Sequence, residues 1–171
     1  AGLMHPQKTI SPKFFYDTHG SELFEKITQL PEYYPTRTER ALLSHNAEAI
    51  AACCGENCIL IEPGSGSSEK VKLLLDQLRP AAYIPMDIAA DFLQASADKL
   101  VIDYPWLDIQ PLCNDFTQLK DLPDNLPTGR RIAFYPGSTL GNMTPENAIA
   151  FLTHLQKQVN LDGGLLIGID L

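Results

Sequence analysis

A chain of 171 residues with 44% hydrophobic side chains is long enough to bury one core, and nothing in it suggests two independently folding units. Its 13 basic and 21 acidic residues give a formal net charge of −8 without a basic run, which argues against a nucleic-acid backbone as the main partner. No apolar run reaches the length of a membrane span, and the N-terminus lacks the layout of a signal peptide. We therefore expect a soluble, cytoplasmic protein.

The first third of the chain is predicted to be helical. Residues 21–30 place their apolar side chains on one face of a short helix, which a proline-bounded aromatic stretch at 31–35 terminates. Thr36 and Glu39 then have the spacing of a capping box, which predicts the start of a second helix.

Residues 59–78 are the most informative stretch. An apolar β-branched run is followed by a turn of glycine and serine and then by a periodic helix. Strand, tight loop and helix in this order hold nucleoside-containing cofactors in α/β proteins. In the turn Gly64-Ser65-Gly66, the two glycines permit positive φ and a close approach of the backbone to a ligand.

The residues after the turn help to distinguish between cofactors. Dinucleotide folds usually carry a third glycine where this chain has Glu69. A carboxylate there would repel the phosphates of NAD, whereas S-adenosylmethionine (SAM) has no phosphate and carries a sulfonium cation. The loop therefore favours SAM over NAD, and a purely structural turn is the alternative for so short a pattern. Ser67 and Ser68 are predicted to cap the helix that follows.

Two acidic positions follow at the predicted ends of the next strands. Asp87 lies 21 residues after Gly66, close to the spacing at which a strand-end acid accepts hydrogen bonds from a ribose. The alternative role is a helix N-cap, which Asp91 would serve as well. Asp115 and Phe116 close a third strand and are suited to bind the adenine amino group and cover the base, with an ordinary turn as the alternative.

Strands and helices alternate over the rest of the chain, which predicts an α/β fold with a mostly parallel sheet. Thr144 and Pro145 are predicted to cap and begin the last helix. Ligands of open α/β sheets bind beyond the carboxyl ends of the strands, so Asn142 is a candidate substrate ligand, with a turn or C-cap role as the alternative. The predicted strands lie near 58–62, 82–87, 107–112, 131–135 and 164–170, and the predicted helices near 67–78, 89–101 and 145–159.

The cysteines and histidines do not have the spacing of a metal site or of a catalytic triad. We expect buried, reduced thiols and assign neither a metal nor a catalytic residue. The cysteines are Cys53, Cys54, Cys58 and Cys113.

Five longer stretches occur in the order of a known family. They read PKFFYD at 12–17, GSELF at 20–24, LPEYYPTRTE at 30–39, GSGSSEK at 64–70 and GSTLGN at 137–142. By these motifs, over about residues 12–171, the chain resembles the SAM-dependent histidine-specific Nα-methyltransferases of ergothioneine biosynthesis. Their relatives include fungal enzymes that methylate a tryptophan derivative.

The resemblance implies transfer of three methyl groups to the α-amine of L-histidine. A related amino acid or small amine as acceptor is one alternative, and a non-catalytic SAM-binding module is another. Methyl transfer from a sulfonium depends mostly on positioning, so a strong acid or nucleophile is not required. The implied contacts to SAM are Gly64, Ser65, Gly66, Lys70, Asp87, Asp115 and Phe116, and those to the substrate amino acid are Tyr16, Tyr33 and Asn142.

The family's chain also continues well beyond residue 171. We therefore expect the N-terminal part of a longer protein, with a Rossmann-like sheet truncated after its fifth strand. Residues 1–56 are assigned to a helical N-terminal segment that contributes to the substrate site, and residues 57–171 to an incomplete SAM-binding domain. The exposed sheet edge is expected to favour a homodimer.

Overall fold

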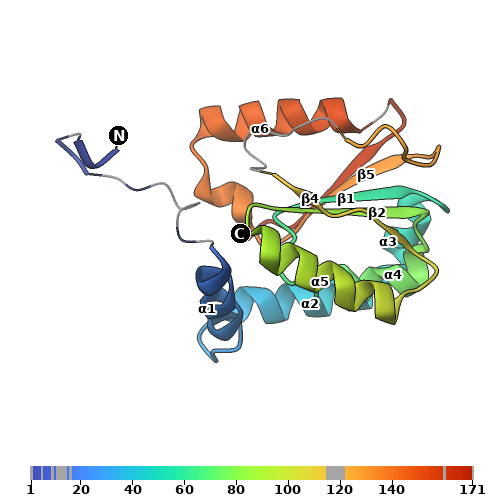
Figure 1. Cartoon of the computed structure of the whole chain (residues 1–171), viewed down its shortest axis with the longest axis horizontal. Helices are drawn as coiled ribbons and strands as arrows, with labels where there is room; N and C mark the ends of the chain where they lie inside the picture. The colour runs from blue at the N-terminus through green and yellow to red at the C-terminus, as the bar shows by residue number, and fades with distance from the viewer. Residues whose placement is uncertain are drawn as a thin grey trace.

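The computed structural model describes residues 2–4, 6–8, 10, 15, 17–114, 122–159 and 161–170, and a parallel sheet lies at its centre (Figure 1). The strand order is β3-β2-β1-β5-β6, with β4 also pairing with β2, and every pair is parallel. The predicted α/β fold is thereby confirmed. The strands are β1 (Ile59–Pro63), β2 (Ala82–Asp87), β3 (Asp108–Ile109), β4 (Leu112–Cys113), β5 (Arg131–Tyr135) and β6 (Gly164–Ile167).

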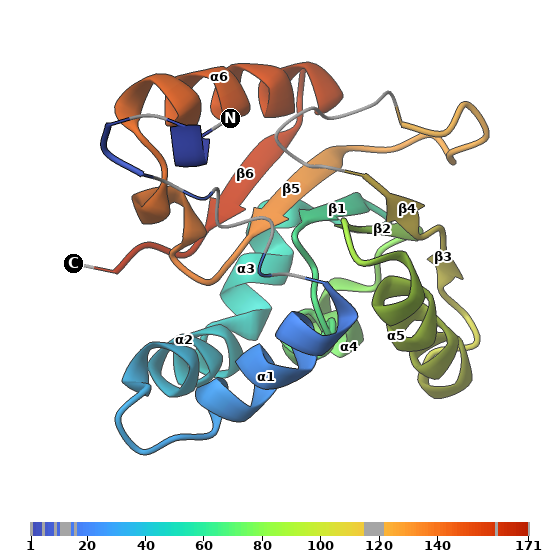
Figure 2. The ribbon, with the colours of Figure 1, turned by 60° about the vertical axis from the view of Figure 1, so that its left-hand side comes forward.

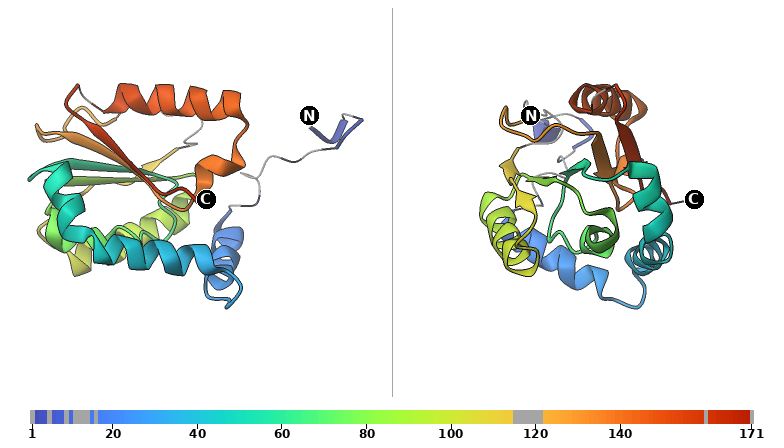
Figure 3. Two further views of the ribbon diagram at one scale, coloured as in Figure 1. Left: turned by 180° about the vertical axis from the view of Figure 1, so that it is seen from behind. Right: turned by 90° about the vertical axis from the view of Figure 1, so that its right-hand side faces the viewer.

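Helices cover both faces of this sheet, as the continuous burial of its central strands requires. Figure 3, in its left-hand view, shows α6 on one face and α2 to α5 on the other. The helices are η1 (Gly2–Met4), α1 (Thr18–Thr28), α2 (Tyr34–His45), α3 (Ala47–Cys54), α4 (Lys72–Leu78), α5 (Ala90–Asp103), η4 (Thr139–Asn142) and α6 (Pro145–Gln158).

The side chains of β1 alternate between two cores. Leu60 packs in the cluster that contains Leu74 of α4, whereas Ile61 packs in the cluster that contains Phe151 of α6. Successive residues of a strand point to opposite faces, so one five-residue strand contributes to both cores. The glycine turn that follows β1 is thus anchored by a strand held from both sides.

The N-terminal helices begin and end at other residues than predicted. The capping box is wrong, because α2 begins at Tyr34 with Tyr33 as its N-cap, and Glu39 lies inside the helix. The chain leaves helical geometry at Asn46, so α2 ends at His45 and a separate helix, α3, begins at Ala47. α1 contacts both α2 and α5, and it lies beside the end of α2 in Figure 2.

Two further predictions differ from the structure. The third predicted strand is split into β3 and β4 around Pro111, because proline has no N–H to donate to a ladder, so the described residues form six short strands where five were predicted. The serine cap is wrong as well, since α4 begins at Lys72 with Val71 as its N-cap and without a side-chain cap. At α6 the cap is confirmed: the Thr144 hydroxyl accepts a hydrogen bond from the Asn147 amide. Among the described residues, the helices are too short or too polar to span a membrane.

Truncation of a core leucine tests the role of α4. Leu74→Ala should lower the free energy of unfolding by about 2–5 kcal/mol, because Leu74 is fully buried and its removal leaves a cavity between α4 and the sheet. The matched control Leu161→Ala, at a fully exposed position, should change it by less than about 0.5 kcal/mol. Urea denaturation measures both, and equal losses would contradict the packing described.

Candidate functional site

The candidate site lies where the strand order reverses. From β1 the chain continues to β2 on one side, and β5 pairs with β1 on the other, so the loops after β1 and β5 diverge at the carboxyl ends of the strands. Ligands of open α/β sheets bind at such a switch point. Here a cleft of about 1960 Å³ is lined by both loops, by α1 and α2 and by η4. Ordinary small-molecule pockets measure roughly 300–1,000 Å³, so this cleft has room for two ligands side by side.

The glycine turn has the backbone that its sequence predicts. Gly64 and Gly66 have φ values of 69° and 53°, a region that residues with a Cβ rarely adopt. The Ser65 amide donates to the carbonyl of Met86 at 2.9 Å. The buried Ser65 hydroxyl has no hydrogen-bond partner among the described residues, and Ser65 is one of the residues that line the cleft. A polar ligand atom at this turn would satisfy it.

Asp87 braces the turn from the end of β2. Its Oδ2 accepts from the Gly66 amide at 3.0 Å and its Oδ1 from the Ala89 amide at 3.1 Å. The helix-cap alternatives for Asp87 and Asp91 are wrong, because the N-cap of α5 is Ala89 and has no side-chain cap. The carboxylate lines the cleft, and its remaining lone pairs can accept hydrogen bonds from hydroxyl groups of a ligand.

Glu62, at the end of β1, is a site residue that the sequence analysis did not identify. It is 2% exposed and lines the cleft, and its Oε2 accepts from the Tyr83 hydroxyl at 2.5 Å. The same hydroxyl lies 3.1 Å from Ser68 Oγ, so Ser68 ties the turn to the sheet instead of capping a helix. Burial raises the pKa of Glu62 to about 8, against the smaller effects of Tyr83 and Lys70. An acid two residues before the first glycine, at the end of a buried strand, is the signal that would have found it.

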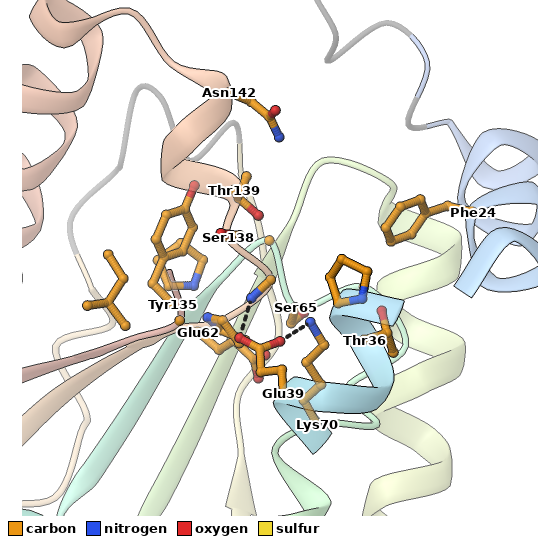
Figure 4. Close-up of a pocket in the computed structure, with 18 of the residues that line it drawn as sticks. Phe24, Thr36, Glu39, Glu62, Ser65, Lys70, Tyr135, Ser138, Thr139 and Asn142 are labelled. Atoms are coloured by element: carbon orange, nitrogen blue, oxygen red, sulfur yellow. Dashed lines mark hydrogen bonds and ion pairs between the residues drawn. The ribbon is translucent and has the colours of Figure 1, made fainter. Parts of the chain in front are cut away.

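Glu39 is a second acid of this kind. It reaches from α2 into the cleft, where its Oε2 lies 2.6 Å from Lys70 Nζ and its Oε1 accepts from the Gly137 amide at 2.7 Å (Figure 4). Lys70, a predicted SAM contact, lines the same cleft as the glycine turn. In the sequence Glu39 has the spacing of a capping box, and that pattern gives no sign of its place in the cleft.

Two of the predicted substrate residues border the cleft. Tyr33 packs its ring edge-on against Phe24 of α1, with the ring centroids 5.9 Å apart. Asn142 is the last residue of η4 and lies on the other side of the opening from Phe24 (Figure 4). The predictions for Tyr16, Asp115 and Phe116 lie outside the described residues.

The charges around the cleft favour a cation. Among the described residues, six acidic side chains line it against two basic ones, and five acids remain without Glu62, which burial keeps largely protonated at neutral pH. This excess of acids favours a ligand with positive charge and disfavours phosphates. The acids are Glu25, Glu39, Glu62, Glu69, Asp87 and Asp170, and the bases are Arg40 and Lys70.

The thiols are only partly as expected. All four cysteines are free, but only Cys54 and Cys58 are buried, whereas Cys53 and Cys113 are exposed. Burial raises the pKa of Cys58 to about 12, which keeps this thiol protonated at neutral pH. Within the described ranges, His, Cys, Asp and Glu do not form a group of three that could hold a metal ion.

The protonation of Glu62 predicts a pH-dependent stability. A glutamate with the ordinary pKa of 4.5 is already ionised in the unfolded chain where folded Glu62, with a pKa of about 8, still keeps its proton. The folded state therefore binds more protons between these values, so the contribution of Glu62 to stability falls as pH rises through this window. Glu62→Gln has no proton to lose, and its free energy of unfolding should rise relative to wild type from pH 4.5 to about 8 and then level off.

Urea denaturation across this pH range provides the measurement. The control Glu56→Gln, at an exposed position, should show no such widening. A constant difference between Glu62→Gln and wild type would contradict a buried, protonated Glu62.

Comparison with known proteins identifies the family. Residues 1–171 match the family described as histidine-specific methyltransferase, SAM-dependent. A histidine N-alpha-methyltransferase of Mycolicibacterium smegmatis is 42% identical over the whole chain, which covers 54% of that protein. A 4-dimethylallyltryptophan N-methyltransferase of Aspergillus fumigatus is 27% identical over 91% of the chain, which covers 48% of that protein.

The fold is similar to that of solved methyltransferases. A magnesium protoporphyrin IX methyltransferase from Synechocystis, solved with bound SAM, superposes with a TM-score of 0.65 at 14% identity over 89% of this chain and 74% of that one. The chain spans about half the length of the two curated relatives named above. With a glycine turn at the switch point of a parallel sheet and a match that runs from the first residue to the last, the chain belongs to the histidine-specific, SAM-dependent methyltransferase family.

Proposed function

We propose that this chain forms the SAM-binding part of an enzyme that transfers three methyl groups to the α-amine of L-histidine. The observation that carries the proposal is the turn at 64–66, braced by Asp87 in a cleft rich in acids. The match to a histidine N-alpha-methyltransferase at 42% identity supports histidine as the acceptor. Residues 57–171 supply the cofactor side in this proposal, and residues 1–56 contribute to the substrate side.

The residues present fit SAM. Its hydroxyl groups would lie against Asp87, its carboxylate against Lys70, and a polar atom against the unpaired Ser65 hydroxyl. The backbone at Gly64 and Gly66 would let the cofactor approach closely. Asp115 and Phe116 remain the proposed adenine contacts. When bound, SAM supplies a methyl group on a positively charged sulfur, which suits the acidic cleft.

The work of the protein in this reaction is positioning. An α-amino group has a pKa of about 8 in peptides, so near neutral pH the site has to bind or generate its free-base form, with the proton passing to water, and hold it in line with the bond that breaks. Asn142 and Tyr33 border the space next to the glycine turn and are the proposed acceptor contacts, with Tyr16. The methylated product is a quaternary ammonium, which a tyrosine face stabilises by roughly 0.5–2 kcal/mol. The rings of Tyr33 and Tyr34 line the cleft and are available for this contact.

A related aromatic amino acid is the second candidate acceptor. The relative from Aspergillus fumigatus is a 4-dimethylallyltryptophan N-methyltransferase, and the volume of the cleft would admit a larger side chain. Labelled SAM with the full-length protein distinguishes the candidates. Methyl incorporation into L-histidine supports the first, and incorporation only into tryptophan derivatives or other amines supports the second. Binding of S-adenosylhomocysteine without transfer to either would leave a SAM-binding module.

Two further expectations stay predictions. One is a cytoplasmic location, and the other is a homodimer through the exposed edge of β6, where Leu165 is 45% exposed.

Removal of the Asp87 carboxylate tests the cofactor site. In the full-length protein, Asp87→Ala should weaken the binding of S-adenosylhomocysteine at least about tenfold, because hydrogen bonds to a charged group contribute about 1.5–3 kcal/mol. Calorimetric titration measures the dissociation constant. Asp98→Ala, which removes an exposed carboxylate from α5, should leave it unchanged. Equal affinities for the wild type and Asp87→Ala would refute this cofactor site.

Removal of the Asn142 amide tests the acceptor site. Asn142→Ala should lower kcat/KM for histidine by roughly tenfold or more, because a polar contact to the acceptor would be lost. The affinity for S-adenosylhomocysteine should not change, since Asn142 belongs to η4 and not to the glycine turn. Methyltransferase kinetics and calorimetry together show the split. Loss of cofactor affinity in this variant would count against an acceptor role.

A further inference from the structure

We propose that Glu39 is a positioning residue that fixes the Lys70 ammonium and the Gly137 amide together, and so couples the cofactor side of the cleft to the acceptor side. This inference rests on the proposed function, because it takes Lys70 as a cofactor contact and Asn142 as an acceptor contact. Its basis is the position of one carboxylate between three separate segments of the chain.

The Glu39 carboxylate is engaged at both oxygens. Oε2 lies 2.6 Å from Lys70 Nζ, and Oε1 accepts from the Gly137 amide at 2.7 Å. The side chains of Lys70 and Glu39 are only 23% and 16% exposed, so solvent screens this ion pair less than one at the surface. Because one oxygen holds a backbone amide, the carboxylate is not free to follow the flexible lysine. Glu39 therefore sets where the ammonium lies.

Lys70 keeps the capacity to bind a ligand while it is held. An ammonium group has three N–H donors, and the contact with Glu39 uses one direction only. The missing side chain of Gly137 leaves room for this ammonium, since a Cβ there would lie 3.2 Å from Lys70 Nζ. A carboxylate of the cofactor can thus bind Lys70 without displacing Glu39.

Gly168, just beyond β6, supports the same arrangement independently. A Cβ built on Gly168 would overlap the Glu39 carboxylate, so the absence of a side chain there makes room for Glu39. The Gly168 amide donates to the carbonyl of Tyr135 at 3.1 Å, which holds this segment against the end of β5. The segment just beyond β6, the loop after β5 and Lys70, which follows the glycine turn, thus meet at one side chain of α2. Figure 4 shows Glu39 between Lys70 and the loop that carries Ser138.

The Gly137 contact extends to the acceptor side of the cleft. Ser138 follows directly and its hydroxyl accepts from the Asp170 amide at 2.5 Å, and η4 with Asn142 begins at the next residue. A shift of the Gly137 amide would therefore move the first residue of η4 in space. Glu39, which lies 98 residues from Gly137 in the sequence, joins this loop to Lys70.

Two variants separate the two contacts. Glu39→Gln keeps an oxygen for the Gly137 amide but places a neutral amide against Lys70, whereas Glu39→Ala removes both contacts. In the full-length protein, Glu39→Gln should weaken S-adenosylhomocysteine binding roughly five- to tenfold and leave KM for histidine within about twofold. Glu39→Ala should raise both the dissociation constant of S-adenosylhomocysteine and KM for histidine. Gly168→Ala should raise both as well, because its side chain displaces the Glu39 carboxylate.

Glu48→Gln, an exposed acid of α3 that does not line the cleft, is the matched control and should change neither value. If Glu39 had a purely structural role, Glu39→Gln would lower the melting temperature but would not affect S-adenosylhomocysteine binding more than KM for histidine. If Glu39→Ala does not fold, Glu39→Gln alone decides. Unchanged or tighter S-adenosylhomocysteine binding by Glu39→Gln overturns the inference while wild-type binding keeps the proposed function, and loss of binding in the wild type itself overturns both.

Discussion

The parallel pairing of β1 with β2 on one side and with β5 on the other is the constraint on which the rest of this structure depends. Parallel strands bring their carboxyl ends to the same edge, so the glycine turn, Asp87 and the loop after β5 must lie together. Each strand is buried on both faces, and a shift by one residue would exchange the two cores. The geometry of the cleft is therefore fixed by the packing of the sheet.

Around this edge the chain uses acids for two different purposes. Asp87 and Glu39 accept hydrogen bonds from backbone amides and so hold loops in place. Glu62 is buried, has a raised pKa and accepts a hydrogen bond from the Tyr83 hydroxyl. Acids in one cleft repel one another when ionised, and Lys70 offsets part of this repulsion by pairing with Glu39. A cleft of this composition suits a ligand that brings its own positive charge. The same composition makes a dinucleotide a poor fit.

Helices α1 and α2 complete the site. Glu25 of α1 accepts from the hydroxyl of Ser67, and Glu39 of α2 holds Lys70, so both helices touch the segment after the glycine turn. The boundary drawn at residue 56 separates elements that differ in sequence pattern but share one cleft. We propose that the cofactor and acceptor sides of this cleft are linked through these side chains.

The sequence alone determined the alternation of strands and helices, the glycine turn with positive φ and the family, because these depend on local periodicity, on the conformational freedom of glycine and on contiguous motifs. It misassigned the capping residues Thr36, Ser67 and Ser68, since helix ends depend on which backbone amides the neighbouring segments leave unpaired. Only the tertiary structure decided the roles of Glu39 and Glu62. Their partners lie 98 and 21 residues away, and the burial that changes the chemistry of a carboxylate exists only once the sheet and helices have packed around it.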